Sequence, residues 1–487
     1  MKATAVRLMM SNVFAFKFFN KHLRTNISLQ KYEAFRATNI TFPLHCLLVP
    51  FSALFPVKEH AFSLHWNLPR ACVVLLFSIL MKTLAKRTKG VSESQTFAIA
   101  GEIRKLKAAG EDIVSFALGE PDFPSPKCAR DAAVDALDHN FTKYTAFEGI
   151  PELRQAVAEK FRRDNKLSAT AETVLVSCGG KQAIYNALQA ICEEGDEVLI
   201  PSPYWVSYPE MVKLASAKPV FIKTGEATKY KVTPELLRTA ITPRTKLIIL
   251  NTPSNPSGMM YTESELRALA HILAEQDIYI LADELYEKIV FDGNTHTSIG
   301  SFDEVRDRTV TINGASKVFS MTGWRIGFMH ANPEIVHAAS IVQIQSTTSA
   351  TSFAQKGALA ALLYAGDDVK RMVAAFQKRR DLLCSLLQDV PNISFTPPQG
   401  AFYLWLNVRH YLESAKMNVS DFAHHLLQNY KVGLMPGNAF GDENYLRISF
   451  ACSEDDIKEG IARLHNGLAS LNLTNNNERS RSKEIVY

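Results

Sequence analysis

Short apolar runs alternate with helical patterns along the chain from about Glu93 to Leu473. The runs are rich in β-branched residues, are apolar on both faces, and end near Gly, Pro, Asn or Asp. Strands of this kind occur in parallel sheets that helices cover on both sides. Thr262 and Glu265 have the spacing of a capping box and mark the start of a helix at Glu263–Glu275. The five strands expected from these runs are Thr173–Ser177, Glu197–Ile200, Lys246–Leu250, Ile278–Leu281 and Thr309–Ile312.

The pattern changes after a long helical stretch at Ser352–Gln388, where a second, α+β unit is expected. Its strands are predicted at Ile393–Phe395, Ala401–Val408 and Tyr445–Phe450, and its helices at Ser420–Asn429 and Glu454–Ser470. The segment before Pro121 is expected to complete it. We therefore predict an α/β protein: a large domain with a mostly parallel sheet covered by helices on both faces, plus a smaller α+β domain. The expected parts are an N-terminal extension (1–80), the N-terminal part of the small domain (81–125), the large domain (126–370), the C-terminal small domain (371–472) and a disordered tail (473–487).

Composition and charge narrow the classes of protein. Of the 487 residues, 47% are apolar and 21% charged, so the chain can bury a large core and is neither wholly disordered nor a polytopic membrane protein. Residues 1–80 hold nine Lys and Arg against two acids, whereas the remaining residues hold 45 against 47. The body is therefore not basic, which argues against nucleic acid as a partner. The seven cysteines include no Cys-x-x-Cys pair, which fits a reducing compartment.

Residues 1–80 allow three interpretations. A basic, acid-poor composition fits an organelle presequence, the apolar residues fit a membrane-associating extension, and Met81 fits a start codon assigned too early. The longest apolar run, Ala71–Met81, has about half of the ~20 residues that span a bilayer, so no stable membrane insertion is expected. The expected location is the cytoplasm, with an organelle as the alternative if the presequence is genuine.

Residues suited to a phosphorylated aldehyde cofactor follow several of the expected strands. Lys317 could form a Schiff base with an aldehyde, and Arg325, eight residues later, offers a guanidinium fork suited to phosphate. Asp283 could keep a pyridinium nitrogen protonated, and Tyr286 could reach the phenolic oxygen of the ring. The Gly179-Gly180 turn precedes a helix N-terminus, which is a ready anion site. Each of these features alone has an ordinary structural explanation, such as a loop lysine or an N-capping aspartate, but their combination favours a site.

Longer motifs in a fixed order strengthen this interpretation. They are LGEPDF at Leu118–Phe123, KYT and GIPELR within Lys143–Arg154, PYWVSYPEM at Pro203–Met211, NGASKVFSMTGWRIGF at Asn313–Phe328 and YLRIS at Tyr445–Ser449. With these motifs the chain resembles the fold-type I pyridoxal-phosphate enzymes, specifically the class I/II aminotransferases. It is most similar to the bacterial and plastid aspartate and aspartate/prephenate aminotransferases. The resemblance runs from about Ser94 to Leu471.

The resemblance implies pyridoxal 5'-phosphate as the cofactor and a homodimer with shared active sites. Lys317 would bind the cofactor covalently and carry a proton, Asp283 would pair with the pyridinium nitrogen, and Tyr286 would assist at the phenolic oxygen. Further cofactor contacts are implied for Gly180, Lys181, Trp205, Asn255, Arg325 and the neighbouring subunit's counterpart of Tyr144. Substrate contacts are implied for Gly119, Trp205, Asn255, Arg447, Thr96 and Lys181. The implied reaction moves an amino group between L-aspartate and 2-oxoglutarate, with prephenate as a further acceptor.

Some positions depart from the family pattern or have two interpretations. Gly314 stands where many aminotransferases carry a phosphate-binding serine, and Ser92 stands where close relatives often carry a lysine. Thr96 and Lys181 match positions that dicarboxylate- and prephenate-using relatives employ for the distal carboxylate, so acidic substrates are expected. The alternative for Lys181 is a side chain that points to solvent.

Other functions remain as alternatives at this point. An aromatic- or alanine-type aminotransferase and a cystathionine β-lyase-like enzyme would share the fold and the lysine. A non-catalytic binding protein is disfavoured, because it would be expected to have lost Lys317 or Asp283. No metal site is expected, since the thirteen histidines form no His-Glu-x-x-His or comparable cluster, and His424-His425 lies on a predicted helix where exposure is the simpler explanation.

Overall fold

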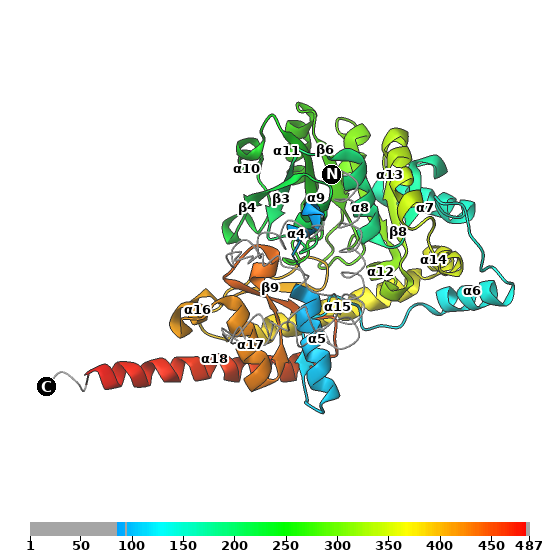
Figure 1. Ribbon diagram of the computed structural model, residues 1–487. Coiled ribbons are helices and arrows are strands. Elements are labelled where there is room, and N and C mark those ends of the chain that lie inside the picture. The colour runs from blue at the N-terminus through cyan, green and yellow to red at the C-terminus, as the bar shows by residue number, and fades with distance from the viewer. Residues whose placement is uncertain (1–84, 93–94, 484–487) are drawn as a thin grey trace, which may run out of the picture. The chain divides into compact units, whose positions relative to one another are not determined.

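A seven-stranded sheet forms the centre of the structure, a computed structural model that describes residues 85–92 and 95–483 (Figure 1). Its strands lie in the order β2-β8-β7-β6-β5-β3-β4, and every neighbouring pair is parallel except that β8 runs antiparallel to β2 and β7. This confirms the predicted mostly parallel sheet. The strands are β2 Val174–Ser177, β3 Glu197–Ser202, β4 Lys218–Lys223, β5 Thr245–Asn251, β6 Tyr279–Asp283, β7 Thr309–Gly314 and β8 Gly327–His330.

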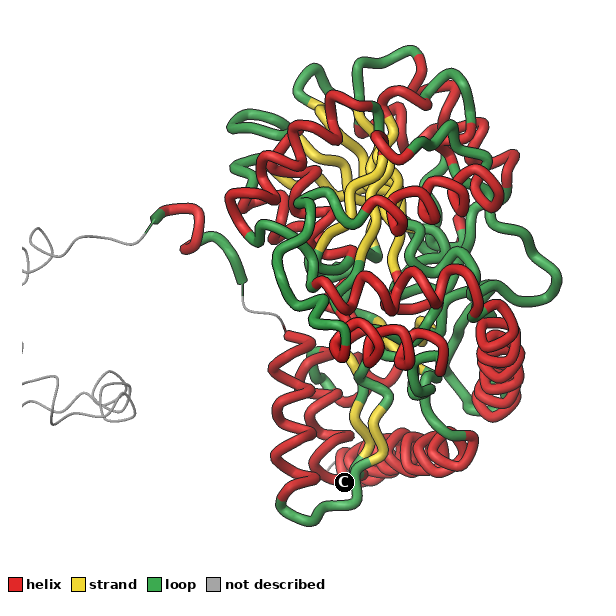
Figure 2. The backbone as a smooth tube through the Cα atoms, turned by 90° about the vertical axis from the view of Figure 1, so that its right-hand side faces the viewer, coloured by secondary structure: helices red, strands yellow, loops and turns green. Residues whose placement is uncertain are grey.

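Alternation of buried side chains explains why helices cover both faces of the sheet. In β5, Leu247 and Ile249 pack into one apolar cluster, while Ile248 and Leu250 pack into another on the opposite face. Figure 2 shows helices on both sides of the strands. The helices of this part are α6 Lys127–Asp138, α7 Pro151–Asn165, α8 Gly180–Ile191, α9 Tyr208–Leu214, α10 Pro234–Ala240, α11 Glu263–Ala274, α12 Ala315–Val318, α13 Pro333–Ser346 and α14 Ser352–Tyr364. The capping box predicted for α11 is present, with Thr262 and Glu265 each accepting from the other's backbone N–H.

The second part contains short strands and long helices around its own apolar cluster. As predicted, the segment before Pro121 joins it: β1 pairs with β10, and the N–H of Ser449 donates to the Phe116 carbonyl. The strands are β1 Val114–Ser115, β9 Tyr403–Asn407, β10 Val432–Gly433, β11 Met435–Pro436 and β12 Tyr445–Ser449. The helices are α5 Gln95–Ala108, α15 Gly366–Leu387, α16 Arg409–Ala415, α17 Val419–Tyr430 and α18 Glu454–Lys483. The short α4 Lys86–Lys89 contacts α9 of the sheet part instead.

Three predictions about these elements were wrong in detail. The stretch Ser352–Gln388 is two helices, α14 and α15, which meet at Gly366, a residue of low helix propensity. Ile393–Phe395 makes only an isolated bridge between Ser394 and Asn407, because Pro397 and Pro398 follow closely and cannot donate to a ladder. The helix predicted at Glu454–Ser470 continues to Lys483, in a stretch without Gly or Pro after Gly467, and the disorder expected for residues 473–487 stays a prediction.

The N-terminal extension, residues 1–80, lies outside the described residues, and so do the interpretations attached to it. Within the described ranges, no helix is both long and apolar enough to cross a membrane. The domain boundaries near residues 125 and 370 stay predictions, and α15 runs without a break across the second one.

Candidate active site

Ten of the twelve predicted site residues line one cavity at the carboxyl ends of the sheet strands, with a volume of about 590 Å³. Parallel strands end at the same edge of the sheet, so their last residues lie close together although they are distant in the sequence. The ten residues are Gly119, Gly180, Lys181, Trp205, Asn255, Asp283, Tyr286, Lys317, Arg325 and Arg447.

Lys317 lies in α12, directly after β7, and its side chain is partly buried. Its ammonium nitrogen donates to the Gly119 carbonyl oxygen at 2.6 Å. Burial lowers the pKa of Lys317 to about 8, and the nearby Glu120 carboxylate opposes this shift. A much larger fraction of Lys317 is therefore neutral near neutral pH than for an ordinary lysine, and only a neutral amine can act as a nucleophile or a base.

Asp283 ends β6 as a buried carboxylate without a cationic partner in the described part of the chain. The Tyr208 hydroxyl donates to its Oδ2 at 2.5 Å, and the Leu285 N–H donates to Oδ1 at 3.3 Å. Burial raises the pKa of Asp283 to about 6, against the lowering effect of these two hydrogen bonds. A pyridinium N–H is the cationic donor that such a carboxylate lacks, so this end of the cavity fits the cofactor ring.

Arg447, in β12, is a buried guanidinium with unused donor capacity. Its two terminal nitrogens donate to Asn255 Oδ1 at 3.1 Å and to the Ala117 carbonyl at 2.7 Å. Its Nε has no partner, and among the described residues no carboxylate pairs with it. The Tyr403 ring lies 4.5 Å from the guanidinium carbon. The guanidinium is therefore positioned to donate hydrogen bonds to a carboxylate of a ligand.

The opposite end of the cavity is built for an anion. Gly179 has φ of 88°, and a Cβ there would meet the Arg325 guanidinium at 2.4 Å, so only glycine allows this approach. The N-terminus of α8 begins at Gly180, and helix N-termini favour phosphate. Arg325 donates to the carbonyls of Thr322 and Cys178. The buried Ser316 also lines this cavity, whereas Gly314 does not.

For three predicted residues the structure does not show a direct role in the cavity. Lys181 lines the cavity with its ammonium 5.0 Å from the centre of the Trp205 ring, so its side chain does not simply extend away from the site. Desolvation, and secondarily Arg325, lower the pKa of Lys181. Tyr144 is 91% exposed and does not line the cavity. Thr96 belongs to α5, but its side chain lies outside the part of the chain that the structure describes.

Sequence reasoning missed several polar residues of the cavity. Tyr208 and Glu120 lie within the quoted motifs but received no role, although Tyr208 is the direct partner of Asp283. The Thr322 hydroxyl donates to the Glu120 carboxylate. Tyr403, whose hydroxyl lies 2.9 Å from that of Tyr286, comes from β9 of the second part and has no local signal at all.

A buried group outside this cavity could in principle bind a cation. Glu284, Glu287 and His296 bring their ligand atoms within 4.8 Å of one another, a combination that no local spacing reveals. Lys160 forms an ion pair with Glu287, and the Asn165 amide donates to both carboxylates. Because an ammonium already occupies this place, the group is a polar network rather than a metal site.

Comparison with known proteins agrees with this geometry. Residues 111–464 match the family model of aminotransferase class I and II. The aspartate aminotransferase of Bacillus subtilis is 43% identical over 383 residues, which cover 78% of this chain and 98% of the relative. The aspartate/prephenate aminotransferase of Cereibacter sphaeroides is 42% identical over 402 residues, which cover 81% and 100%.

A solved structure shows the same likeness in three dimensions. The aspartate aminotransferase from Thermus thermophilus with maleate superimposes with a TM-score of 0.76 at 39% identity, covering 80% of this chain and all of that chain. The family model covers well over half of the chain, and the relatives are matched over nearly their whole length. The chain therefore belongs to the class I and II aminotransferases, with the fold-type I architecture of its structural neighbours.

Proposed function

We propose that this aminotransferase moves an amino group between L-aspartate and 2-oxoglutarate with pyridoxal 5'-phosphate as its cofactor. The observation that carries the proposal is the Arg447 guanidinium, buried without a carboxylate partner in the cavity that also holds Lys317 and Lys181. Two separate cations suit a substrate with two carboxylates. The names of the most similar relatives and the maleate of the Thermus thermophilus structure support a dicarboxylate.

The lining residues fit the cofactor by chemistry. Asp283 would face the pyridinium nitrogen, Tyr286 and Asn255 the phenolic oxygen, and Trp205 the ring. Arg325 and the backbone amides at Gly180 and Lys181 would hold the phosphate, with Ser316 as our candidate for the contact that Gly314 lacks. When bound, pyridoxal phosphate supplies an electron-withdrawing ring that stabilises negative charge at the substrate Cα.

The residues of the chain then bind, orient and transfer a proton. Arg447 would grip the α-carboxylate, while Asn255 and Ala117 hold the guanidinium in place. Lys317, with its lowered pKa, would take the proton from the substrate Cα on its Nζ. The same nitrogen would then deliver the proton to the C4′ atom of the cofactor. The Gly119 carbonyl accepts a hydrogen bond from the free amino group of Lys317.

Lys181 and Thr96 are proposed to bind the distal carboxylate of the substrate. An ammonium and a hydroxyl form a looser clamp than a guanidinium fork, so they tolerate carboxylates at more than one distance. This supports prephenate as a further amino acceptor, the substrate that appears in the name of the Cereibacter sphaeroides relative.

The proposed assembly is a homodimer with shared active sites. Tyr144 supports it, because a large aromatic residue that is 91% exposed and does not line the active-site cavity of its own subunit is available to reach the phosphate site of a neighbour. The cytoplasm remains the proposed location.

Half-reactions test the proposed function. Purified enzyme with cofactor is mixed with aspartate, glutamate, alanine and an aromatic amino acid in turn, and the change in cofactor absorbance is followed. We expect the fastest change with aspartate or glutamate. Borohydride reduction should fix the cofactor to a peptide that contains Lys317, and Lys317→Ala should abolish turnover. Alanine as the best donor would contradict the dicarboxylate assignment.

A second experiment tests the distal contact. We expect Lys181→Ala to lower kcat/KM for aspartate by roughly tenfold or more, as for loss of a charge-assisted hydrogen bond, and to leave alanine nearly unaffected. Thr96→Val should act in the same direction. Equal losses for both amino acids would remove the distal-carboxylate role and leave only a general aminotransferase.

A further inference from the structure

A second cavity, also of about 590 Å³, shares no lining residue with the active-site cavity. The two are separated by the backbone of two short segments. In the segment 286–290, Tyr286 lines the active site, whereas Glu287, Lys288 and Val290 line the second cavity. In the segment 313–319, Ser316 and Lys317 line the active site, and four other residues line the second cavity. The second cavity therefore lies directly behind the catalytic segments.

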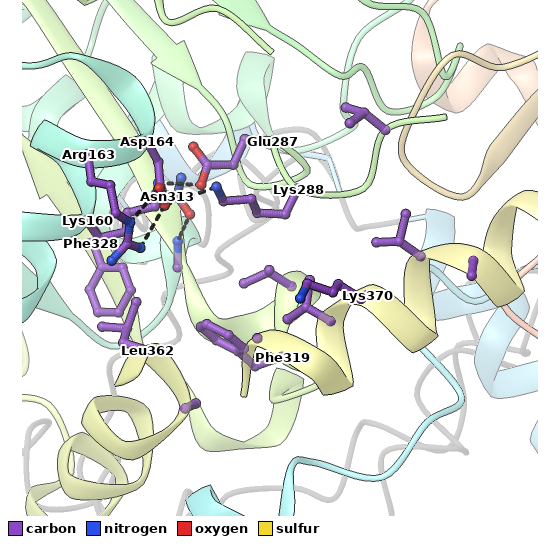
Figure 3. A pocket seen from close by; sticks show the side chains of 18 of the residues that line it. Lys160, Arg163, Asp164, Glu287, Lys288, Asn313, Phe319, Phe328, Leu362 and Lys370 are labelled. Atoms are coloured by element: carbon purple, nitrogen blue, oxygen red, sulfur yellow. Dashed lines mark hydrogen bonds and ion pairs between the residues drawn. The ribbon is translucent and has the colours of Figure 1, made fainter. Parts of the chain in front are cut away.

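The middle of the second cavity is apolar. Phe319 and Val318 come from the catalytic segment, Phe328 from β8, Leu362 from α14 and Val373 from α15. In Figure 3 five charged side chains lie together, and Phe319 and Leu362 lie apart from this group, with Lys370 beside Phe319; the five are Lys160, Arg163, Asp164, Glu287 and Lys288. A volume of this size is in the range of cavities that bind small organic ligands.

Three cations and two carboxylates of the lining lie together, namely Lys160, Arg163 and Lys288 with Asp164 and Glu287, while Lys370 lies apart and pairs with Asp367. Arg163 and Lys288 both pair with the single carboxylate of Asp164, at 2.8 Å and 3.0 Å (Figure 3). Lys160 and Glu287, almost fully buried, neutralise each other. Arg163 and Lys288 are 68% and 40% exposed, so an anionic group can approach them from solvent without displacing a buried pair.

We propose that this cavity is a second ligand site, for a small molecule with a flat apolar body and one anionic group. The apolar body would lie among Phe319, Leu362 and Val373, and the anion beside Arg163 and Lys288. The proposal does not rest on the substrate assigned to the active site, since the two cavities have no residue in common.

Calorimetric titration of the full-length, cofactor-loaded enzyme tests the site with 8-anilinonaphthalene-1-sulfonate, which has a flat apolar body and one sulfonate. We expect one probe per chain. Ala374→Trp, at an exposed position of α15 that lines the cavity, should remove binding by filling it. Lys288→Gln should weaken binding by roughly three- to fivefold, the effect of a partly exposed ion pair. Lys378→Gln is the matched control, because this exposed lysine of α15 does not line the cavity.

A neutral analogue, N-phenyl-1-naphthylamine, separates the two parts of the proposal. Its affinity should fall with Ala374→Trp and stay unchanged with Lys288→Gln. Unchanged affinity for the sulfonate probe in Ala374→Trp would overturn the site, as would the absence of binding to the wild-type enzyme, and unchanged affinity in Lys288→Gln would overturn the anion contact. Aspartate transamination by the wild-type enzyme distinguishes the two proposals: an enzyme that transaminates aspartate but binds no probe contradicts only the second site, and an enzyme that binds the probe but does not transaminate aspartate contradicts only the proposed function.

Discussion

The hydrogen bond from Tyr208 to Asp283 should set the pH range in which the enzyme binds its cofactor. The carboxylate is buried, its pKa is raised to about 6, and the Tyr208 hydroxyl at 2.5 Å works against that rise. Tyr208→Phe removes the donor and leaves the burial. A hydrogen bond to a charged group contributes about 1.5–3 kcal/mol, which corresponds to a pKa change of about 1 to 2. We therefore expect the pKa of Asp283 in the variant to lie between about 7 and 8.

The sign of the effect follows from the charge that the cofactor needs. Only ionised Asp283 pairs with a pyridinium, so affinity should fall as the pH drops through the pKa of this carboxyl group. Titration of cofactor-free enzyme with pyridoxal phosphate between about pH 5 and 9 would give the acid limb of the affinity curve. In Tyr208→Phe that limb should move to higher pH.

A matched variant shows whether the effect belongs to Asp283. Tyr403→Phe also removes a buried hydroxyl from the cavity, but this hydroxyl contacts Tyr286 and not Asp283. Its acid limb should stay where the wild-type limb lies. If Tyr208→Phe leaves the limb in place too, the hydrogen bond does not control the ionisation of Asp283, and the reasoning is refuted.

Three further predictions concern other parts of the chain. Arg447→Lys keeps the charge but loses the two-pronged geometry, so kcat/KM should fall for every amino acid; a loss confined to aspartate would mean that Arg447 contacts the side chain. Gly314→Ser should lower the free energy of unfolding by roughly 1–3 kcal/mol, because its Cβ would lie 3.0 Å from the Ile326 carbonyl oxygen and 3.1 Å from Gly327 Cα. An unchanged melting temperature would show that the backbone moves to make room for the serine. Hydrogen bonds from Thr242, Arg244 and Lys218 lower the pKa of Glu197 to about 2. In urea unfolding, the difference in stability between wild type and Glu197→Gln should therefore be complete above about pH 4.5 and disappear toward pH 2. A difference that persists at pH 2 would contradict this.

Five of the seven strands of the sheet could be predicted because each of them carries its own signal, whereas β4 and β8 were not predicted. Apolar residues on both faces of β5 and β6 identify buried parallel strands without any knowledge of their neighbours. The division at Gly366 was missed because a single glycine within an apolar helical pattern is a weak signal, and propensity alone did not decide where one helix ended. The strand predicted around Ser394 was wrong for the opposite reason. Its residues suit a strand, but the neighbouring chain pairs with it through one bridge only.

The candidate site divides in a similar way. Residues within motifs, such as Lys317 and Asp283, could be named from the sequence, and the structure brings them into one cavity. Tyr403 could not, because its hydroxyl reaches Tyr286 from a strand 117 residues further along the chain. The second cavity could not be predicted either, since its charged end and its apolar walls come from helices and strands that only the tertiary structure brings together.

The unpaired guanidinium of Arg447 has a consequence for the resting protein. Its desolvation is completed when the chain folds, since Asn255 and Ala117 hold it in the interior while Nε stays without a partner. A buried charge without a counter-ion destabilises the native state relative to a paired one. In the proposed function the substrate α-carboxylate would supply that counter-ion, so the enzyme should resist heat better with a dicarboxylate bound than at rest. The group proposed to bind the α-carboxylate is thus also a source of native-state instability, which a bound ligand would relieve.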